Sequence, residues 1–100
     1  MLIINILVVD DDQDIRILLK TYLEKEGYEN IHFVKSAQKT CKFLGINNGE
    51  AEIEIDIIIL DIMLGDGNGI DLCRKIKNEK DYEDIPVIMI TAKSNNECLK

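Results

Sequence analysis

The chain has 100 residues, 46% of them hydrophobic and 31% charged, which is typical of a single globular domain with a modest core. Its net charge of −7 argues against direct binding to nucleic acid, because that binding requires Lys and Arg to replace phosphate counterions. A membrane span is not expected, since the longest apolar run, residues 55–64, is interrupted by Asp56 and Asp61.

In the first half of the chain, the hydrophobic pattern predicts two strand–helix units. Residues 3–9 are rich in Ile, Leu and Val, as in a strand buried on both faces, and residues 14–26 repeat apolar side chains at helical spacing. Gly27 is a typical helix stop. Residues 31–35 predict a second, shorter strand, and residues 36–44 a second helix whose first residue, a serine, is a favourable N-cap.

The second half of the chain repeats this alternation. The elements that we expect there, in chain order, are a strand at 55–60, a turn at 65–69, a helix at 70–79, a strand at 87–90 and the start of a helix at 94–100. The third strand delivers Asp61 at its carboxyl end, and Pro86 opens the fourth strand, which ends at Thr91.

The spacing of apolar residues also predicts which face of each helix is buried. The expected buried residues are Ile15, Leu18, Leu19, Tyr22 and Leu23 in the first helix, Ala37, Cys41 and Leu44 in the second, and Ile70, Cys73 and Ile76 in the third. With Cys98, the chain has an odd number of widely spaced cysteines, which predicts reduced thiols and no disulfide or metal site built on them. The amino terminus lacks the features of a secretory signal, so we expect a cytoplasmic protein.

Alternating strands and helices predict an α/β fold with a doubly wound parallel sheet and helices on both faces. Ligands of such sheets bind outside the carboxyl ends of the strands. Asp10, Asp11, Asp61 and Thr91 all fall at these ends, which is the main sequence evidence for a site.

Converging carboxylates repel one another, so they must protonate, move apart or share a cation. Mg²⁺ prefers oxygen ligands and typically keeps several waters, so one or two carboxylates with phosphate oxygens complete its shell. An acidic pocket with one spare nucleophile would therefore suit a phosphoryl acceptor. A Ca²⁺ loop that starts at Asp10 is not expected, because Ile15 and Thr21 occupy the positions of its Gly and Glu.

Four segments occur in a specific order across residues 3–92: ILVVDDDQDIR with an acidic pair, DIIILDIML with an aspartate, NG at 68–69, and VIMITA with a Thr-Ala pair. Together they resemble the receiver domain of two-component response regulators. The resemblance implies a flavodoxin-like sheet with strand order 2-1-3-4 in this chain.

By this resemblance, Asp61 takes a phosphoryl group from a histidine kinase or a phosphotransfer protein. Asp11 and Asp61 would bind Mg²⁺ directly, with the backbone carbonyl of Met63, and Asp10 would act largely through a bound water. Thr91 would be the switch residue whose hydroxyl turns toward the phosphoryl group. The small Ala92 would leave access to the site, and an output domain or effector, in some relatives a DNA-binding one, would receive the signal.

The chain also departs from the family pattern. Gly65 stands where a proline is usual, and residues 1–100 lack most of the fourth helix and all of the fifth strand and helix, with the lysine that pairs with the phosphoryl group. Lys93 does not match that lysine. The fourth strand is then an exposed apolar edge, so we expect self-association of the isolated chain.

Two other functions are compatible with parts of the sequence. A binding module that keeps the fold without switching is favoured by the absent lysine. A phosphatase of the haloacid dehalogenase type would use Asp10 as nucleophile and Asp12 as acid/base, although Asp14 stands where Thr or Val is expected. For Asp12 we expect a place at the entrance of the first helix, and for His32 a structural role.

Overall fold

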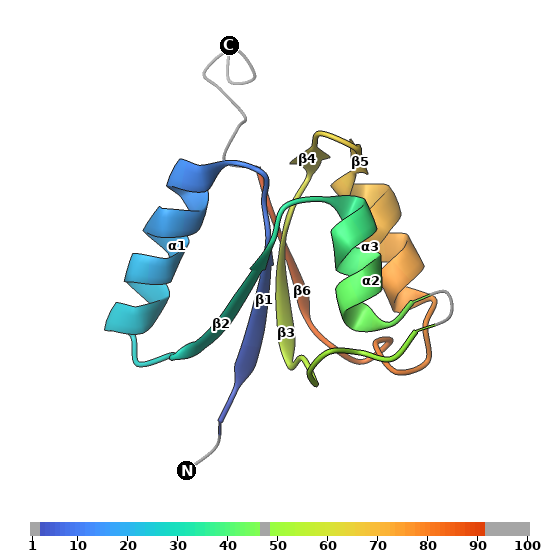
Figure 1. Ribbon diagram of the computed structural model, residues 1–100, viewed down its shortest axis with the longest axis horizontal. Coiled ribbons are helices and arrows are strands. Elements are labelled where there is room, and N and C mark those ends of the chain that lie inside the picture. The colour runs from blue at the N-terminus through green and yellow to red at the C-terminus, as the bar shows by residue number, and fades with distance from the viewer. Residues whose placement is uncertain (1–2, 47–48, 92–100) are drawn as a thin grey trace.

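The structure, a computed structural model, describes residues 3–46 and 49–91, which form a parallel four-stranded sheet with helices on both faces (Figure 1). The strands of this sheet are β1 (Asn5–Val9), β2 (Asn30–Val34), β3 (Ile57–Asp61) and β6 (Val87–Ile90). Their order is β2-β1-β3-β6, and every neighbouring pair is parallel. The predicted doubly wound α/β class and strand order 2-1-3-4 are confirmed, because β6 is the fourth strand of this sheet along the chain.

Helix α1 (Gln13–Lys25) covers one face of the sheet, and α2 (Ala37–Leu44) and α3 (Gly69–Lys77) cover the other (Figure 1). A short antiparallel hairpin of β4 (Met63–Leu64) and β5 (Gly67–Asn68) connects β3 to α3. The turn predicted at 65–69 is therefore part of a hairpin, and its last residue already begins α3. Other element ends differ from the predicted ones by one or two residues. The helix expected at 94–100 lies outside the described residues.

Side chains of β1 alternate between two cores. Leu7 and Val9 pack with residues of α2 and α3, whereas Ile6 and Val8 pack with residues of α1. All four are at most 3% exposed, which confirms the prediction of a strand buried on both faces. The pleat of the strand, with its period of two, thus supplies both hydrophobic layers.

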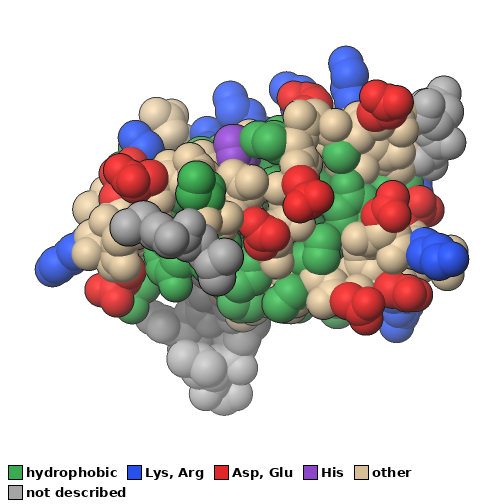
Figure 2. Space-filling model, turned by 90° about the horizontal axis from the view of Figure 1, so that it is seen from below, with side chains coloured by type: hydrophobic (Ala, Val, Ile, Leu, Met, Phe, Trp, Pro, Cys, Tyr) green, Lys and Arg blue, Asp and Glu red, His purple; other side chains and the backbone are tan. Residues whose placement is uncertain are grey.

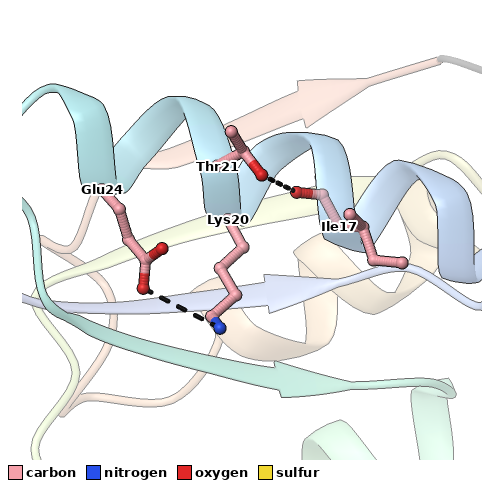
Figure 3. Close-up of polar contacts among 4 residues, drawn as sticks. All are labelled: Ile17, Lys20, Thr21 and Glu24. Atoms are coloured by element: carbon pink, nitrogen blue, oxygen red, sulfur yellow. Dashed lines mark hydrogen bonds and ion pairs between the residues drawn. The ribbon is translucent and has the colours of Figure 1, made fainter.

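The buried face of α1 is narrower than predicted. Leu23 is buried and Leu19 packs beside it, but Leu18 and Tyr22 are 63% and 61% exposed. The prediction of burial was wrong for these two residues, because each lies one position, about 100° around the helix, before a residue that contacts the sheet. Lys20 and Glu24 of α1 are exposed, and Lys20 Nζ lies 3.9 Å from a carboxylate oxygen of Glu24 (Figure 3).

On the opposite side of the sheet, the predicted faces are mostly correct. Cys41 and Leu44 of α2 and Ile76 of α3 are buried, and Cys73 is half-buried. Ile70 is 44% exposed, so its predicted burial was wrong. It belongs to the first turn of α3, where the helix leaves the hairpin.

Acidic side chains are spread over the surface. Figure 2 views the molecule from the amino ends of the parallel strands and shows them scattered among apolar side chains on that face. The negative net charge is therefore not confined to the carboxyl ends, where the expected site lies. None of the described helices is long and apolar enough to cross a membrane.

Three hydrogen bonds from two side chains fix the connection from α3 to β6. The hydroxyl of the buried Tyr82 donates to the carbonyl of Leu44, at the end of α2, over 2.5 Å. Lys77 Nζ donates to the carbonyls of Glu83, at 3.2 Å, and Ile85. These bonds hold the start of β6 against the helical layer.

We expect Tyr82→Phe to lower the free energy of unfolding by about 1 kcal/mol, because the Leu44 carbonyl loses its donor. Burial raises the pKa of the Tyr82 hydroxyl above its ordinary value of 10.0, so its contribution is complete below about pH 10 and is lost as pH rises through the raised pKa. Urea unfolding from neutral to alkaline pH measures both effects. The exposed Tyr22→Phe is the matched control, and an equal loss in the two variants would contradict this role.

Candidate functional site

Three carboxylates meet at the carboxyl ends of β1 and β3. Asp10 and Asp11 follow β1 and Asp61 ends β3, and one carboxylate oxygen from each lies within 4.8 Å of the others. The parallel pairing of Val9 with Leu60 brings the two strand ends together. Asp10 and Asp61 are 0% exposed, whereas Asp11 is exposed. The site therefore has a buried floor and one carboxylate in contact with solvent.

Backbone hydrogen bonds orient the residues that follow β1. The Asp12 N–H donates to Asp10 Oδ1 at 2.9 Å, and the Asp12 carboxylate accepts the N–H groups of Asp14 and Ile15 at the start of α1. Arg16 Nη1 donates to the Asp10 carbonyl at 2.8 Å. Asp12 is thus the N-cap of α1, as expected at the entrance of the helix, and Arg16 brings a positive charge beside the acidic cluster.

The hairpin after β3 starts at the site. The Met63 N–H donates to Asp61 Oδ1 at 3.0 Å, which orients the carboxylate. The Gly69 N–H donates to the Ile62 carbonyl at 2.7 Å, so the chain returns to the end of β3. A Cβ at Gly69 would overlap the Asp61 carbonyl oxygen and lie 2.7 Å from Ile62 Cα. Only glycine allows this close approach without a shift of the backbone.

Asp66 connects the hairpin to α2. Its carboxylate accepts the N–H groups of Ala37 and Gln38, at 2.8 and 3.0 Å, in the first turn of the helix. These two hydrogen bonds, Ala37 first, lower the pKa of the Asp66 carboxyl below its ordinary value of 3.8. The hairpin is therefore held both at Asp61 and at α2.

Other predicted site residues lie at the same edge. Thr91 directly follows Ile90, which pairs with Asp61 across β3 and β6, and it is exposed. Met63 is 55% exposed beside Asp61, and the role of its carbonyl as a metal ligand stays a prediction. Ala92 lies outside the described residues. His32 packs its ring against Phe43, with 5.9 Å between ring centroids, as expected for a structural residue.

Sequence reasoning missed Arg16 and Asp66. Arg16 is six residues from its acceptor, and its basic side chain close after three aspartates was a usable signal. Asp66 was included only in a turn, and its partners in α2 are 28 and 29 residues away. Nothing in the local sequence indicates that distant pairing.

Comparison with known proteins identifies the class of the fold and site. Residues 6–100 match the response regulator receiver domain, and the chain belongs to this family. Receiver domains are signalling switches of two-component systems, and they bind Mg²⁺ or Mn²⁺ at an acidic pocket.

Individual relatives agree with this assignment. The transcriptional regulatory protein GltR of Pseudomonas aeruginosa is 41% identical over 91 residues, which are 91% of this chain and 35% of GltR. The chain spans about a third of the length of the curated relatives it matches first.

Two solved structures share the fold. The response regulator MaeR bound to beryllium trifluoride has a TM-score of 0.77 and 33% identity, with 96% of this chain and 76% of MaeR covered. The Mn²⁺-bound form of the response regulator Rcp1 has a TM-score of 0.77 and 25% identity, with 93% and 68% covered.

We expect Asp66→Asn to lower the free energy of unfolding at neutral pH by about 1 kcal/mol, because the amide loses the negative charge at the first turn of α2 and one of the two acceptor oxygens. Because the folded-state pKa is lowered, the contribution of Asp66 is present above about pH 4 and is lost as pH falls through the folded pKa. The variant should therefore lose less stability in acid than the parent chain, as measured by urea unfolding at several pH values.

The control for Asp66 is Asp71→Asn. Asp71 lies 3.6 Å from Arg74, and both side chains are more than 70% exposed, so this change should cost less than about 0.5 kcal/mol. Identical acid profiles for the two variants would show that Asp66 does not hold α2.

Gly69→Ala should destabilise the protein by about 1–3 kcal/mol, because the new methyl group overlaps backbone at the end of β3. Gly67→Ala is the matched control, since its Cβ would meet only the Ala37 Cβ at 3.7 Å. Denaturant unfolding compares the two variants. A Gly69→Ala protein as stable as the parent would refute the close approach.

Proposed function

We propose that this chain is a phosphoacceptor, and that Asp61 takes a phosphoryl group from a histidine kinase or a phosphotransfer protein. The convergence of Asp10, Asp11 and Asp61 within 4.8 Å carries the proposal. A carboxylate nucleophile beside other oxygen ligands is the arrangement that such a transfer requires. Membership of the receiver family supports the same role.

In the proposed reaction, a carboxylate oxygen of Asp61 attacks the phosphorus atom of a phosphohistidine. The new O–P bond replaces the P–N bond, and the imidazole nitrogen keeps the electron pair of the broken bond. The Met63 N–H orients the nucleophile through its 3.0 Å bond to Oδ1. Burial of Asp61 limits the access of water to the reacting atoms.

The donor set fits a hard divalent cation, because it offers three carboxylates and no sulfur or nitrogen ligand. We propose that Asp11, Asp61 and the Met63 carbonyl hold Mg²⁺, and that Asp10 acts largely through a bound water. Mg²⁺, when bound, neutralises charge on the transferring phosphoryl group. The Mn²⁺-bound form of Rcp1 supports a divalent cation at this kind of site.

Thr91 is the switch residue of the proposed mechanism. Thr91 directly follows Ile90, the β6 residue that pairs with Asp61, and this position supports the role. The end of the neighbouring strand thus places the Thr91 residue next to Asp61. Ala92 would leave access to the phosphoryl group.

By analogy with GltR, of which this chain covers 35%, we propose that an output domain receives the signal. The regulatory role in the name of GltR supports a transcriptional output, and we propose a cytoplasmic location.

A fifth strand–helix unit would pair with β6, since no described strand pairs with its outer edge and Ile88 is 49% exposed. The same edge would allow the isolated chain to self-associate, which sedimentation equilibrium tests.

The phosphatase alternative fits the geometry less well. Its acid/base residue would be Asp12, but that carboxylate accepts two N–H groups as the N-cap of α1. A binding module without switching remains the second candidate, and phosphate incorporation separates it from a phosphoacceptor.

Incubation with Mg²⁺ and a small acyl phosphate should add one phosphoryl group to the chain, and Asp61→Asn should abolish the adduct. Intact-protein mass spectrometry, with hydroxylamine treatment to cleave an acyl phosphate, measures it. Asp56→Asn, which removes an exposed carboxylate at the start of β3, should leave it unchanged. A folded parent chain without an adduct would favour the binding module, and an adduct lost only in Asp10→Asn would favour the phosphatase.

Mg²⁺ should bind to the parent chain and raise its melting temperature, because the cation binds only the folded acidic cluster. Asp11→Asn should weaken this binding about tenfold or more, since it removes a proposed ligand. Isothermal titration calorimetry measures the affinity. Asp14→Asn makes the same charge change in the first turn of α1, so an equal weakening in both variants would indicate only a general effect of charge.

A further inference from the structure

A groove of about 840 Å³ lies between α2 and α3, on the face of the sheet opposite α1. The buried side chains of Cys41, Ile46 and Leu72 line it and form an apolar floor. The β4–β5 hairpin contributes Gly67 and Asn68 at one end. The groove is therefore bounded by two helices and by the segment that follows Asp61.

The rim of this groove is basic. Lys39 and Lys42 of α2 and Lys75 of α3 line it, and all three are exposed. In the described part of the chain, none of these lysines forms an ion pair.

Two acidic residues also line the groove, and each interacts with a neighbouring group. The Asp66 carboxylate accepts hydrogen bonds from the first turn of α2, and Asp71 lies 3.6 Å from Arg74. Both carboxylates keep their negative charge, so a lining of three lysines and two aspartates carries a net charge of +1, and Arg74 beside Asp71 adds a further positive charge next to it.

We propose that this groove docks an acidic peptide segment that carries apolar residues. Charge complementarity supports this occupant, since a chain of net charge −7 surrounds one apolar hollow with three lysines and only two aspartates. Apolar side chains of the peptide would contact Cys41, Ile46 and Leu72, and its carboxylates would face the lysines.

A peptide fits these features better than a nucleic acid does. Three lysines neutralise few phosphates, and the net negative charge of the chain repels a long polyanion. A short acidic segment, in contrast, responds mainly to the charges within about 8 Å at physiological salt. A phosphate backbone also offers no apolar groups that could contact the apolar floor of the groove.

The proposed docking does not depend on phosphorylation of Asp61. The groove shares the hairpin with the acidic pocket, but its lysines and apolar floor belong to α2, α3 and the residue Ile46 after α2. Binding measured without Mg²⁺ or phosphoryl donor therefore tests the groove alone, and its failure is distinct from a failure of the proposed function.

The probe is a short fluorescein-labelled peptide in which two Leu residues are flanked by Glu and Asp. We expect it to bind the unphosphorylated chain, with amide shifts in NMR spectra confined to α2, α3 and the hairpin, and with weaker binding as salt is raised. A peptide with Lys in place of each acidic residue should not bind.

The decisive variant combines Lys39→Gln, Lys42→Gln and Lys75→Gln, and should weaken binding of the acidic probe about tenfold. The matched control combines Lys25→Gln, Lys35→Gln and Lys80→Gln, which removes the same charge from other exposed positions. Circular dichroism confirms that both variants fold.

Four results would overturn the proposal. They are no binding of the acidic probe, amide shifts outside the groove, equal weakening in the two triple variants, and tighter binding of single-stranded oligothymidylate than of the peptide.

Discussion

Mutual repulsion of the three carboxylates is the constraint on which the rest of the site depends. Two ionised carboxylates held within 4.8 Å oppose each other by about 3 kcal/mol at an effective dielectric constant of about 20. The protein holds them there because Asp10 directly follows β1 and Asp61 ends β3, and the side chains of both strands are buried on both faces. The hydrophobic cores thus supply the free energy that keeps the acidic residues together, and a shared cation would relieve the repulsion.

Local hydrogen bonds then set the orientation of these carboxylates. The Asp12 N–H contacts Asp10, the Met63 N–H contacts Asp61, and Arg16 reaches the Asp10 carbonyl from α1. Two of the three donors are backbone amides, whose positions follow from the strand ends. Within residues 3–46 and 49–91, the main chain around β1 and β3 therefore sets much of the orientation of the site.

The fold was predictable because the inner strands are uniformly apolar and because helical and strand periods differ clearly. The acidic cluster was predictable because parallel strands place Asp10 and Asp61 at one edge. Sequence periodicity wrongly predicted burial for Leu18 and Ile70, which lie at the edge of the apolar face of their helices. At such positions, tertiary packing decides whether the side chain contacts the sheet or solvent. Sequence periodicity also failed for contacts between distant segments, such as Tyr82 with the end of α2, which no local pattern encodes.

The hairpin after Asp61 has both ends fixed, which limits how this segment can change in evolution. At its far end, Gly69 lies against the end of β3. Asp66, between Asp61 and Gly69 in the sequence, accepts hydrogen bonds from the first turn of α2. An insertion or deletion between Asp61 and Gly69 would displace either Gly69 from the end of β3 or Asp66 from the first turn of α2. Among related chains, insertions and deletions should therefore occur in the other connections of the fold. Between Asp61 and Gly69, related chains should differ only by substitutions.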